Sequence, residues 1–167
     1  MTNYKITKKQ HNSARCMVCG VDNKFSLGSR FYELDNGELA VTFRAEDWHQ
    51  GYPGRVHGGV AAAVLDELIG RAMNIIEPGA WGVTVELSVK YKKPVPTETD
   101  LKAIARITKS GSRIAEGTGE LVLPDGTVAV SAWGKYMKMP VEKISGRGFS
   151  EKEWFVIDEN DPEELEI

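Results

Sequence analysis

The stretch that decides the fold is Val56-His57-Gly58-Gly59-Val60-Ala61-Ala62-Ala63-Val64-Leu65-Asp66-Glu67. Glycine is a poor helix former because it loses the most backbone freedom on ordering, yet two glycines stand at its start. Apolar residues then continue on all sides to Ile76, a pattern typical of a helix buried in a core. Glu77-Pro78-Gly79 ends it. The sequence therefore predicts a core helix over residues 58–76.

Two features of this helix indicate chemistry. The first N–H groups of a helix have no partner within it, and the macrodipole makes that end positive, so Gly58 and Gly59 could bind a carbonyl oxygen or an anion. Asp66 lies among apolar neighbours, where a carboxylate must be paired, hydrogen-bonded or shifted in pKa. A structural alternative has Asp66 capping a loop or reaching solvent, with the glycines allowing close packing. Together with His57, the pattern favours a functional site.

The rest of the chain is dominated by strand patterns. Alternating apolar and polar residues predict strands around residues 38–45 and 83–91. Three more strands are expected at 99–109, 112–123 and 127–139, separated by hairpin turns at Lys109-Ser110-Gly111-Ser112 and Pro124-Asp125-Gly126. Because a largely antiparallel sheet must cover the apolar helix, the predicted fold class is α+β.

The length of 167 residues suits one domain with a substantial core. We expect an N-terminal arm at residues 1–24, the domain at 25–139 and an acidic C-terminal extension at 140–167 that folds back as a short helix or extended arm. Neither a signal peptide nor a membrane span is visible, so a cytoplasmic protein is expected.

Charge is unevenly distributed. Residues 151–167 carry eight acidic residues and one basic residue, so the remainder carries 20 basic and 16 acidic residues. A mildly basic body suits a phosphorylated ligand, although scattered solubilising charge is the simpler and favoured explanation. The dense basic stripe of a nucleic-acid binder is missing, and no nucleic-acid partner is expected.

Helix geometry separates the two functional features. A rise of 1.5 Å per residue places Gly59 and Asp66 about 10 Å apart along the axis, whereas a nucleophile and an oxyanion donor both lie about 3 Å from one reacting atom. If both act on one substrate, they come from two antiparallel helices of a homodimer, which then has two equivalent sites.

The motif HGGVAAAVLDE, the strand order and the central helix together resemble the PaaI-like branch of the hotdog-fold acyl-CoA thioesterases, over about residues 25–139. The resemblance implies a hotdog fold, in which an antiparallel sheet wraps around a long central helix. It also implies hydrolysis of an acyl thioester with no cofactor, coenzyme A being part of the small-molecule substrate. A homodimer, assembled as a dimer of dimers or homotetramer, is expected.

The same resemblance implies roles for individual residues. Gly58, with its neighbour Gly59, offers backbone N–H to the thioester carbonyl, and His57 orients the loop or the substrate. Asp66 is the catalytic carboxylate, contributed by the opposite subunit as nucleophile or as general base on water. Thr84 helps to place the attacking water or the carboxylate.

One position departs from the family pattern. Some members have Asn six residues before the histidine, where this chain has Gly51. A polar role there passes to Gln50 or His49, or is absent. Candidate partners for the phosphates of coenzyme A are basic residues near strand ends: Lys90, Lys92, Lys109 and Arg113. Core packing is expected of three tryptophans: Trp48, Trp81 and Trp133.

Two other functions remain open at this point. A non-catalytic hotdog module would bind acyl-CoA as a sensor or carrier, and Gly51 favours it. An enoyl-thioester hydratase or dehydratase would need a paired Asp and His on one site, which the glycines after His57 do not favour. The acyl group and the thiol carrier, coenzyme A or acyl carrier protein, also stay open.

A second motif is Cys16-Met17-Val18-Cys19. A C-x-x-C pair is half of a common zinc site, and His11 could add a third ligand. The competing interpretations are a redox pair and, foremost, a cysteine pair that is simply buried or exposed.

Overall fold

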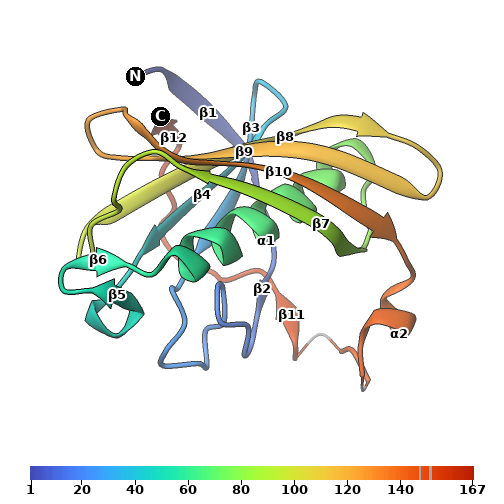
Figure 1. Ribbon diagram of the computed structural model, residues 1–167. Coiled ribbons are helices and arrows are strands. Elements are labelled where there is room, and N and C mark those ends of the chain that lie inside the picture. Colours follow the sequence, from blue (N-terminus) through green and yellow to red (C-terminus); the bar gives the residue numbers. More distant parts are fainter. Residues whose placement is uncertain (147, 151) are drawn as a thin grey trace.

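The computed structural model describes residues 1–146, 148–150 and 152–167, and it is organised around one long helix. This helix, α1 (Gly58–Ile76), lies against a broad sheet (Figure 1). Its bounds confirm the prediction. Its buried side chains come from several sides of the helix: Ala61, Val64, Leu65, Leu68, Ile69, Arg71, Ala72 and Met73.

Eight antiparallel strands form the sheet, in the order β12-β1-β3-β4-β8-β9-β10-β7. Along the chain they are β1 (Asn3–Lys9), β3 (Arg30–Leu34), β4 (Leu39–Arg44), β7 (Gly82–Tyr91), β8 (Asp100–Ser110), β9 (Ile114–Val122), β10 (Val128–Lys138) and β12 (Glu164–Glu166). Helix α1 contacts β4, β7, β8, β9 and β10. An antiparallel sheet wrapped around a central helix is the α+β hotdog arrangement that the sequence predicted.

Both ends of the chain join this sheet. Strand β1 lies between β3 and β12, so the segment expected as an arm contributes a strand. The acidic C-terminal segment is held by cations of the sheet. Lys9 Nζ lies 2.8 Å from both Glu159 Oε1 and Asp161 Oδ1, and Arg30 Nε lies 2.5 Å from Glu159 Oε1. These acids therefore serve to attach the extension.

The other side of α1 is covered by the N-terminal loop and the returning C-terminal chain. Strands β2 (Asn12–Ser13) and β11 (Trp154–Phe155) pair beneath the helix (Figure 1). Val18, Cys19 and Leu27 are buried in the same core cluster as α1. This double cover explains why the helix is apolar around most of its circumference.

Short elements make the remaining connections. The 3-10 helix η1 (Asp47–His49) and strands β5 (Gln50–Tyr52) and β6 (Arg55–Val56) lead into α1. After β10, the four-residue helix α2 (Val141–Ile144) precedes the extended C-terminal chain. The extension thus contains both a short helix and extended segments.

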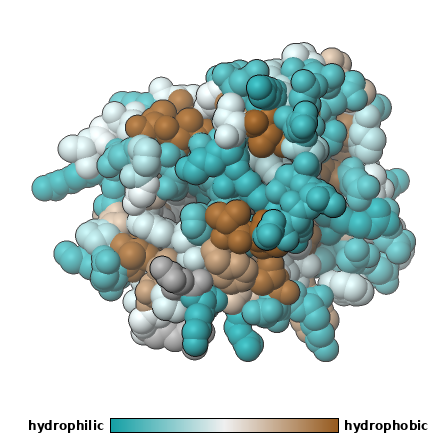
Figure 2. All heavy atoms as spheres, turned by 180° about the vertical axis from the view of Figure 1, so that it is seen from behind, coloured by the Kyte–Doolittle hydropathy of each residue, from teal (hydrophilic) through white to brown (hydrophobic). Residues whose placement is uncertain are grey.

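The surface is mixed in character. Seen from behind, it is mostly hydrophilic, with apolar areas separated by polar side chains (Figure 2). Within the part of the chain that the structure describes, none of the helices has the length and hydropathy needed to cross a bilayer.

Candidate active site

The start of α1 is closed by His57. This residue is the N-cap, with φ −60° and ψ 136°, and its Nδ1 accepts a 2.9 Å hydrogen bond from Gly59 N–H. Its carbonyl oxygen accepts from Val60 N–H at 2.9 Å. The expectation of two free glycine amides is therefore wrong for Gly59, because the cap takes its N–H. Among the described residues, Gly58 N–H has no hydrogen-bond partner.

The loop before the helix fits closely around His57. A Cβ added at Gly51 would lie 3.2 Å from both Cα and Cδ2 of His57, so a side chain there would press on the cap. On the other side, the Tyr91 hydroxyl donates to the Gly58 carbonyl oxygen at 2.8 Å. The lack of a side chain at Gly51 thus leaves room for the His57 cap at the start of α1.

His49 and Gln50 shape this loop. His49 is buried, and its Nδ1 accepts from Glu46 N–H at 2.9 Å while its Nε2 lies 2.7 Å from the Phe25 carbonyl oxygen. Both ring nitrogens are therefore engaged within the chain. Gln50 Oε1 accepts from Gly54 N–H at 3.3 Å and closes the turn.

Asp66 lies in the middle of α1 with two hydroxyl partners. Thr84 Oγ1 is 2.9 Å from Asp66 Oδ1 and 3.1 Å from Oδ2. The Tyr136 hydroxyl lies 3.0 Å from Oδ1 and 2.9 Å from the Asp66 carbonyl oxygen. The structure thus brings together Asp66 and Thr84, both of which were named as site residues from the sequence, and leaves Oδ2 as the oxygen with fewer hydrogen-bond partners.

Tyr136 is a site residue that the sequence reasoning missed. It is buried, and burial followed by the neighbouring Asp66 charge raises the pKa of its phenol well above the ordinary value, so it stays a neutral donor. The glycines around it were an available signal. A Cβ at Gly134 would lie 2.6 Å from the Tyr136 hydroxyl oxygen, and one at Gly70 would lie 3.2 Å from its ring. Glycine inside a helix or strand marks such close approach.

A cavity of about 310 Å³ opens beside Asp66, and we call it the Asp66 cavity. Its lining includes the polar groups of Asp66, Thr84 and Tyr136 and the indole rings of Trp81 and Trp154. The two indole rings are 5.1 Å apart. Trp81 was expected in the core but lines this cavity, and Trp154 arrives from the C-terminal extension. Trp48, also expected in the core, is 57% exposed.

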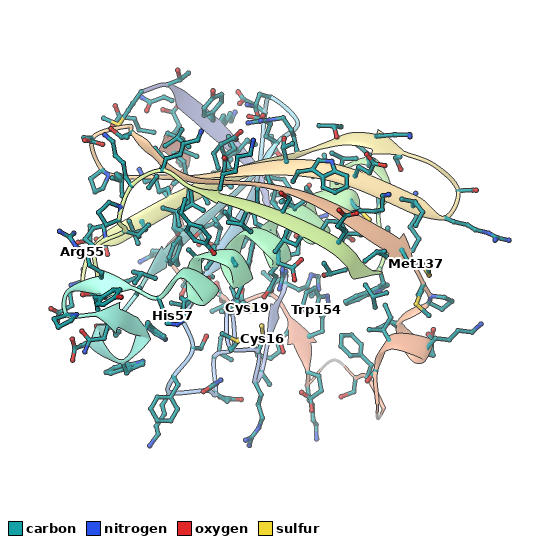
Figure 3. All side chains as sticks on the ribbon, viewed as in Figure 1. Cys16, Cys19, Arg55, His57, Met137 and Trp154 are labelled. Carbon is teal, nitrogen blue, oxygen red and sulfur yellow. The ribbon has the colours of Figure 1, made fainter. Side chains whose placement is uncertain are left out.

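A second cavity, of about 390 Å³, lies at the start of α1. Its lining includes Gly58 and three cationic side chains, those of Arg55, Lys92 and Lys93. Figure 3 shows Arg55 and His57 together at this end of the helix. Of the four basic residues that the sequence suggested as phosphate partners, Lys92 lines this cavity.

The other three basic residues lie elsewhere. Lys90 lines a separate cavity of about 400 Å³ with Trp133 and Glu120. Lys109 Nζ is 4.0 Å from Glu116 Oε1, and Arg113 is exposed in the turn between β8 and β9. Trp133 is half-buried there rather than in the core.

The cysteines approach the residue after Asp66. Cys16 Sγ lies 3.1 Å from Glu67 Oε2, and Cys16, Cys19 and Glu67 present ligand atoms that all lie within 4.8 Å of one another. The side-chain hydrogen bond from Cys19 lowers the pKa of Cys16, and the same bond raises that of Cys19. The His11 ring stacks on Trp154 and lies outside this group.

Comparison with known proteins finds a match to one family model. Residues 53–130 match the model of the Thioesterase superfamily. Human acyl-coenzyme A thioesterase 13 is 28% identical over 94 residues, covering 52% of this chain and 67% of that protein. The segment from Pro53 to Val130, slightly less than half of the chain, thus matches the Thioesterase superfamily.

Solved structures agree with this assignment. A crystal structure of a thioesterase superfamily protein superimposes with a TM-score of 0.67 at 31% identity, covering 73% of this chain and 59% of that one. The chain therefore spans less than two thirds of that relative. The PaaI protein of E. coli superimposes with a TM-score of 0.62 at 20% identity, covering 68% of this chain and 81% of that one. At that identity the likeness is one of fold.

Proposed function

We propose that the protein hydrolyses acyl thioesters, with acyl-CoA as the preferred class, to the free acid and the thiol. The observation that carries the proposal is the Asp66 carboxylate, held by two hydroxyl groups at the Asp66 cavity. The match of residues 53–130 to the Thioesterase superfamily and the similarity of the chain to human acyl-coenzyme A thioesterase 13 support the same reaction. Coenzyme A enters as part of the substrate, and the proposed chemistry needs no further cofactor.

In the proposed mechanism Asp66 is a general base. Thr84 and Tyr136 fix Oδ1 by hydrogen bonds, so Oδ2 is the oxygen that takes a proton from water. The water oxygen attacks the thioester carbonyl carbon, the carbon–sulfur bond breaks, and the sulfur leaves as thiolate and is then protonated. Negative charge develops on the carbonyl oxygen, where a preorganised N–H donor such as Gly58 stabilises it.

The donor and the base belong to different chains in this proposal. Gly58 and Asp66 are eight residues apart on α1, about 12 Å along its axis, so one carbonyl group cannot contact both within a chain. A homodimer with antiparallel α1 helices solves this, and the edge strand β7 offers the contact. It pairs with β10 on one side of the described sheet, and Val85 and Tyr91 on it are 52% and 55% exposed.

The cavity at the start of α1 suits the coenzyme A portion of the substrate. Arg55, Lys92 and Lys93 place three positive charges beside Gly58. Phosphate groups bind such cations through charge-assisted hydrogen bonds. Lys92 thus keeps its predicted role in this proposal, and Arg55 and Lys93 replace Lys90, Lys109 and Arg113. The dimer of dimers and the cytoplasmic location stay predictions from the sequence.

The test is an assay of free-thiol release from short, medium, long and aromatic acyl-CoAs, together with acyl pantetheines that lack the nucleotide. Hydrolysis of at least one acyl-CoA with multiple turnovers is expected, and loss of the nucleotide should raise KM if the three cations bind it. Tight binding of acyl-CoA without thiol release would indicate that the protein is a sensor and not an enzyme. Water addition to an enoyl-CoA without thiol release would indicate a hydratase.

A further inference from the structure

The group formed by Cys16, Cys19 and Glu67, which we call the thiol cluster, has no part in the proposed reaction. It joins the N-terminal loop to α1 directly after Asp66. Figure 3 shows Cys16 and Cys19 side by side beneath the helix. The three side chains come from two separate segments, residues 16–19 and α1, so the tertiary fold and not the C-x-x-C spacing alone brings them together.

The cysteine loop is shaped so that hydrogen-bond donors point at sulfur. Val18 N–H donates to Cys16 Sγ at 3.3 Å, and Ser13 N–H donates to Cys19 Sγ at 3.4 Å. Gly20 N–H turns back to the Cys16 carbonyl oxygen at 2.8 Å, and a Cβ at Gly20 would lie only 2.3 Å from that oxygen. The tight turn therefore requires glycine. A neutral thiol is a weak acceptor, so this arrangement fits thiolates.

Arg71 adds a fixed positive charge to the cluster. It is buried, and its Nη2 lies 3.1 Å from Cys19 Sγ and 2.7 Å from Glu67 Oε1. The Arg71 Cζ atom lies over the rings of both Phe31 and Trp154, 4.1 and 4.5 Å from their centroids. Contacts with two aromatic rings thus help to fix its position, in addition to the hydrogen bonds.

Charge and ligand chemistry together indicate what the cluster would bind. With both cysteines deprotonated, as metal binding requires, the two thiolates and the carboxylate carry three negative charges, and Arg71 neutralises one of them. Two negative charges remain in a largely buried place, which is costly unless a divalent cation balances them. Thiolate ligands select zinc over hard cations such as magnesium or calcium. A zinc–sulfur distance of about 2.3 Å and a zinc–oxygen distance of about 2.1 Å suit ligand atoms this close together.

We propose that Cys16, Cys19 and Glu67 bind one zinc ion. Water completes the four ligands of the tetrahedral ion. Glu67 is the third protein ligand in this proposal. His11, which the sequence suggested for that role, has its ring stacked on Trp154 instead. The ion ties the N-terminal loop to the helix one residue beyond Asp66, and Glu67 and Arg71 also line the Asp66 cavity. Its role is to fix this wall of the cavity.

Metal analysis of the full-length chain tests the proposal. The protein is purified under reducing conditions without metal-affinity chromatography, and its zinc content is measured by elemental mass spectrometry. About one zinc ion per chain is expected for the wild type. Cys16→Ser with Cys19→Ser should lose the metal, and Glu67→Gln should weaken zinc affinity at least about tenfold. Glu77→Gln, an exposed glutamate just beyond the same helix, is the matched control and should keep full occupancy.

A spectroscopic measurement covers the case in which the serine variants fail to fold. Cobalt(II) added to the metal-stripped wild-type chain should give the intense visible bands of a tetrahedral ion and a sulfur-to-cobalt charge-transfer band, both abolished by zinc. Two results would overturn the proposal. One is wild-type protein with far less than one zinc and no cobalt–thiolate band. The other is a Glu67→Gln variant that binds zinc as tightly as the wild type.

Discussion

The middle of α1 and its start differ in how much of the proposed site a single chain supplies. Around Asp66 the chain provides Thr84, Tyr136 and an aromatic cavity wall. At the start, His57 has taken the Gly59 amide, and one N–H, that of Gly58, is left to bind an oxygen. The difference teaches that the contacts of the proposed base are complete within one chain, whereas the proposed oxyanion donor, the Gly58 N–H, has no partner among the described residues.

Replacing the base should have the largest effect. Asp66→Asn removes the group that accepts the proton from water, so kcat should fall by about 10³-fold or more. Thiol release measures this loss, and thermal unfolding and size-exclusion chromatography check that the variant is folded and assembled. Asp100→Asn, at an exposed site on β8, should stay fully active. Turnover of Asp66→Asn at the wild-type rate would remove Asp66 from the mechanism.

The helix start can be tested by removing a single N–H. Proline is well accepted at the first position of a helix, and the extended conformation of His57 suits the residue before a proline. Gly58→Pro should therefore preserve α1 and lower kcat by about 10²-fold, because the oxyanion donor is lost.

Gly58→Ala is the control for that change. Both variants add a Cβ that meets the exposed Tyr91 ring at 3.3 Å, but alanine keeps the N–H. The alanine variant should retain most of the activity. Equal activity of the two variants would show that the Gly58 amide binds no reacting oxygen, and the start of the helix would then be structural.

Tyr136→Phe should lower kcat by about tenfold, because one charged hydrogen bond to Asp66 is lost. Burial and the Asp66 charge raise the pKa of Tyr136 above the ordinary value of about 10. The folded phenol therefore stays protonated as the pH rises through that value. Its contribution to stability is complete below the unfolded pKa and is lost as the pH rises toward the folded one.

The pH dependence of rate gives this prediction a second measurement. The ratio of wild-type to Tyr136→Phe activity should be constant from neutral pH to just below pH 10, since the wild-type hydroxyl does not ionise in that range. A ratio that falls toward one as the pH rises would mean that the hydroxyl loses its proton there. The assignment of Tyr136 as a neutral donor would then be wrong.

The smallest effect is expected at Thr84, because the hydroxyl of Tyr136 also donates a hydrogen bond to the Asp66 carboxylate. Thr84→Val is nearly isosteric and removes the hydroxyl, so kcat should fall by about threefold to tenfold. Thr84→Ser keeps the hydroxyl and should be close to the wild type. A serine variant as impaired as the valine variant would assign Thr84 a packing role.

Local patterns predicted much of this molecule. Two glycines and Pro78-Gly79 bounded α1, and the alternation of apolar residues located β7. Such local patterns did not predict the contacts between segments that lie far apart in the sequence. Tyr136 reaches Asp66 only because β10 crosses the helix at Gly70, and Glu67 meets the cysteines only because the N-terminal loop covers the second side of α1. Strand β1 shows only a short alternation, with Tyr4 and Ile6 between polar residues, and its place between β3 and β12 was not predicted.

The His57 cap shows the same limit at short range. A histidine before two glycines indicated a functional loop, but which amide its ring would take depends on the rotamer and on the space that Gly51 leaves beside it. The sequence pattern accordingly overestimated the number of free amides at the start of α1.

Subunit complementation tests the central claim most directly. Asp66→Asn and Gly58→Pro chains are each nearly inactive, and they are mixed in equal amounts after reversible dissociation. In a site shared between two chains, half of the dimers are mixed and each mixed dimer has one intact site, so activity should return to about a quarter of the wild-type level. No recovery, with mixed dimers shown to be present by mass spectrometry, would contradict the shared site.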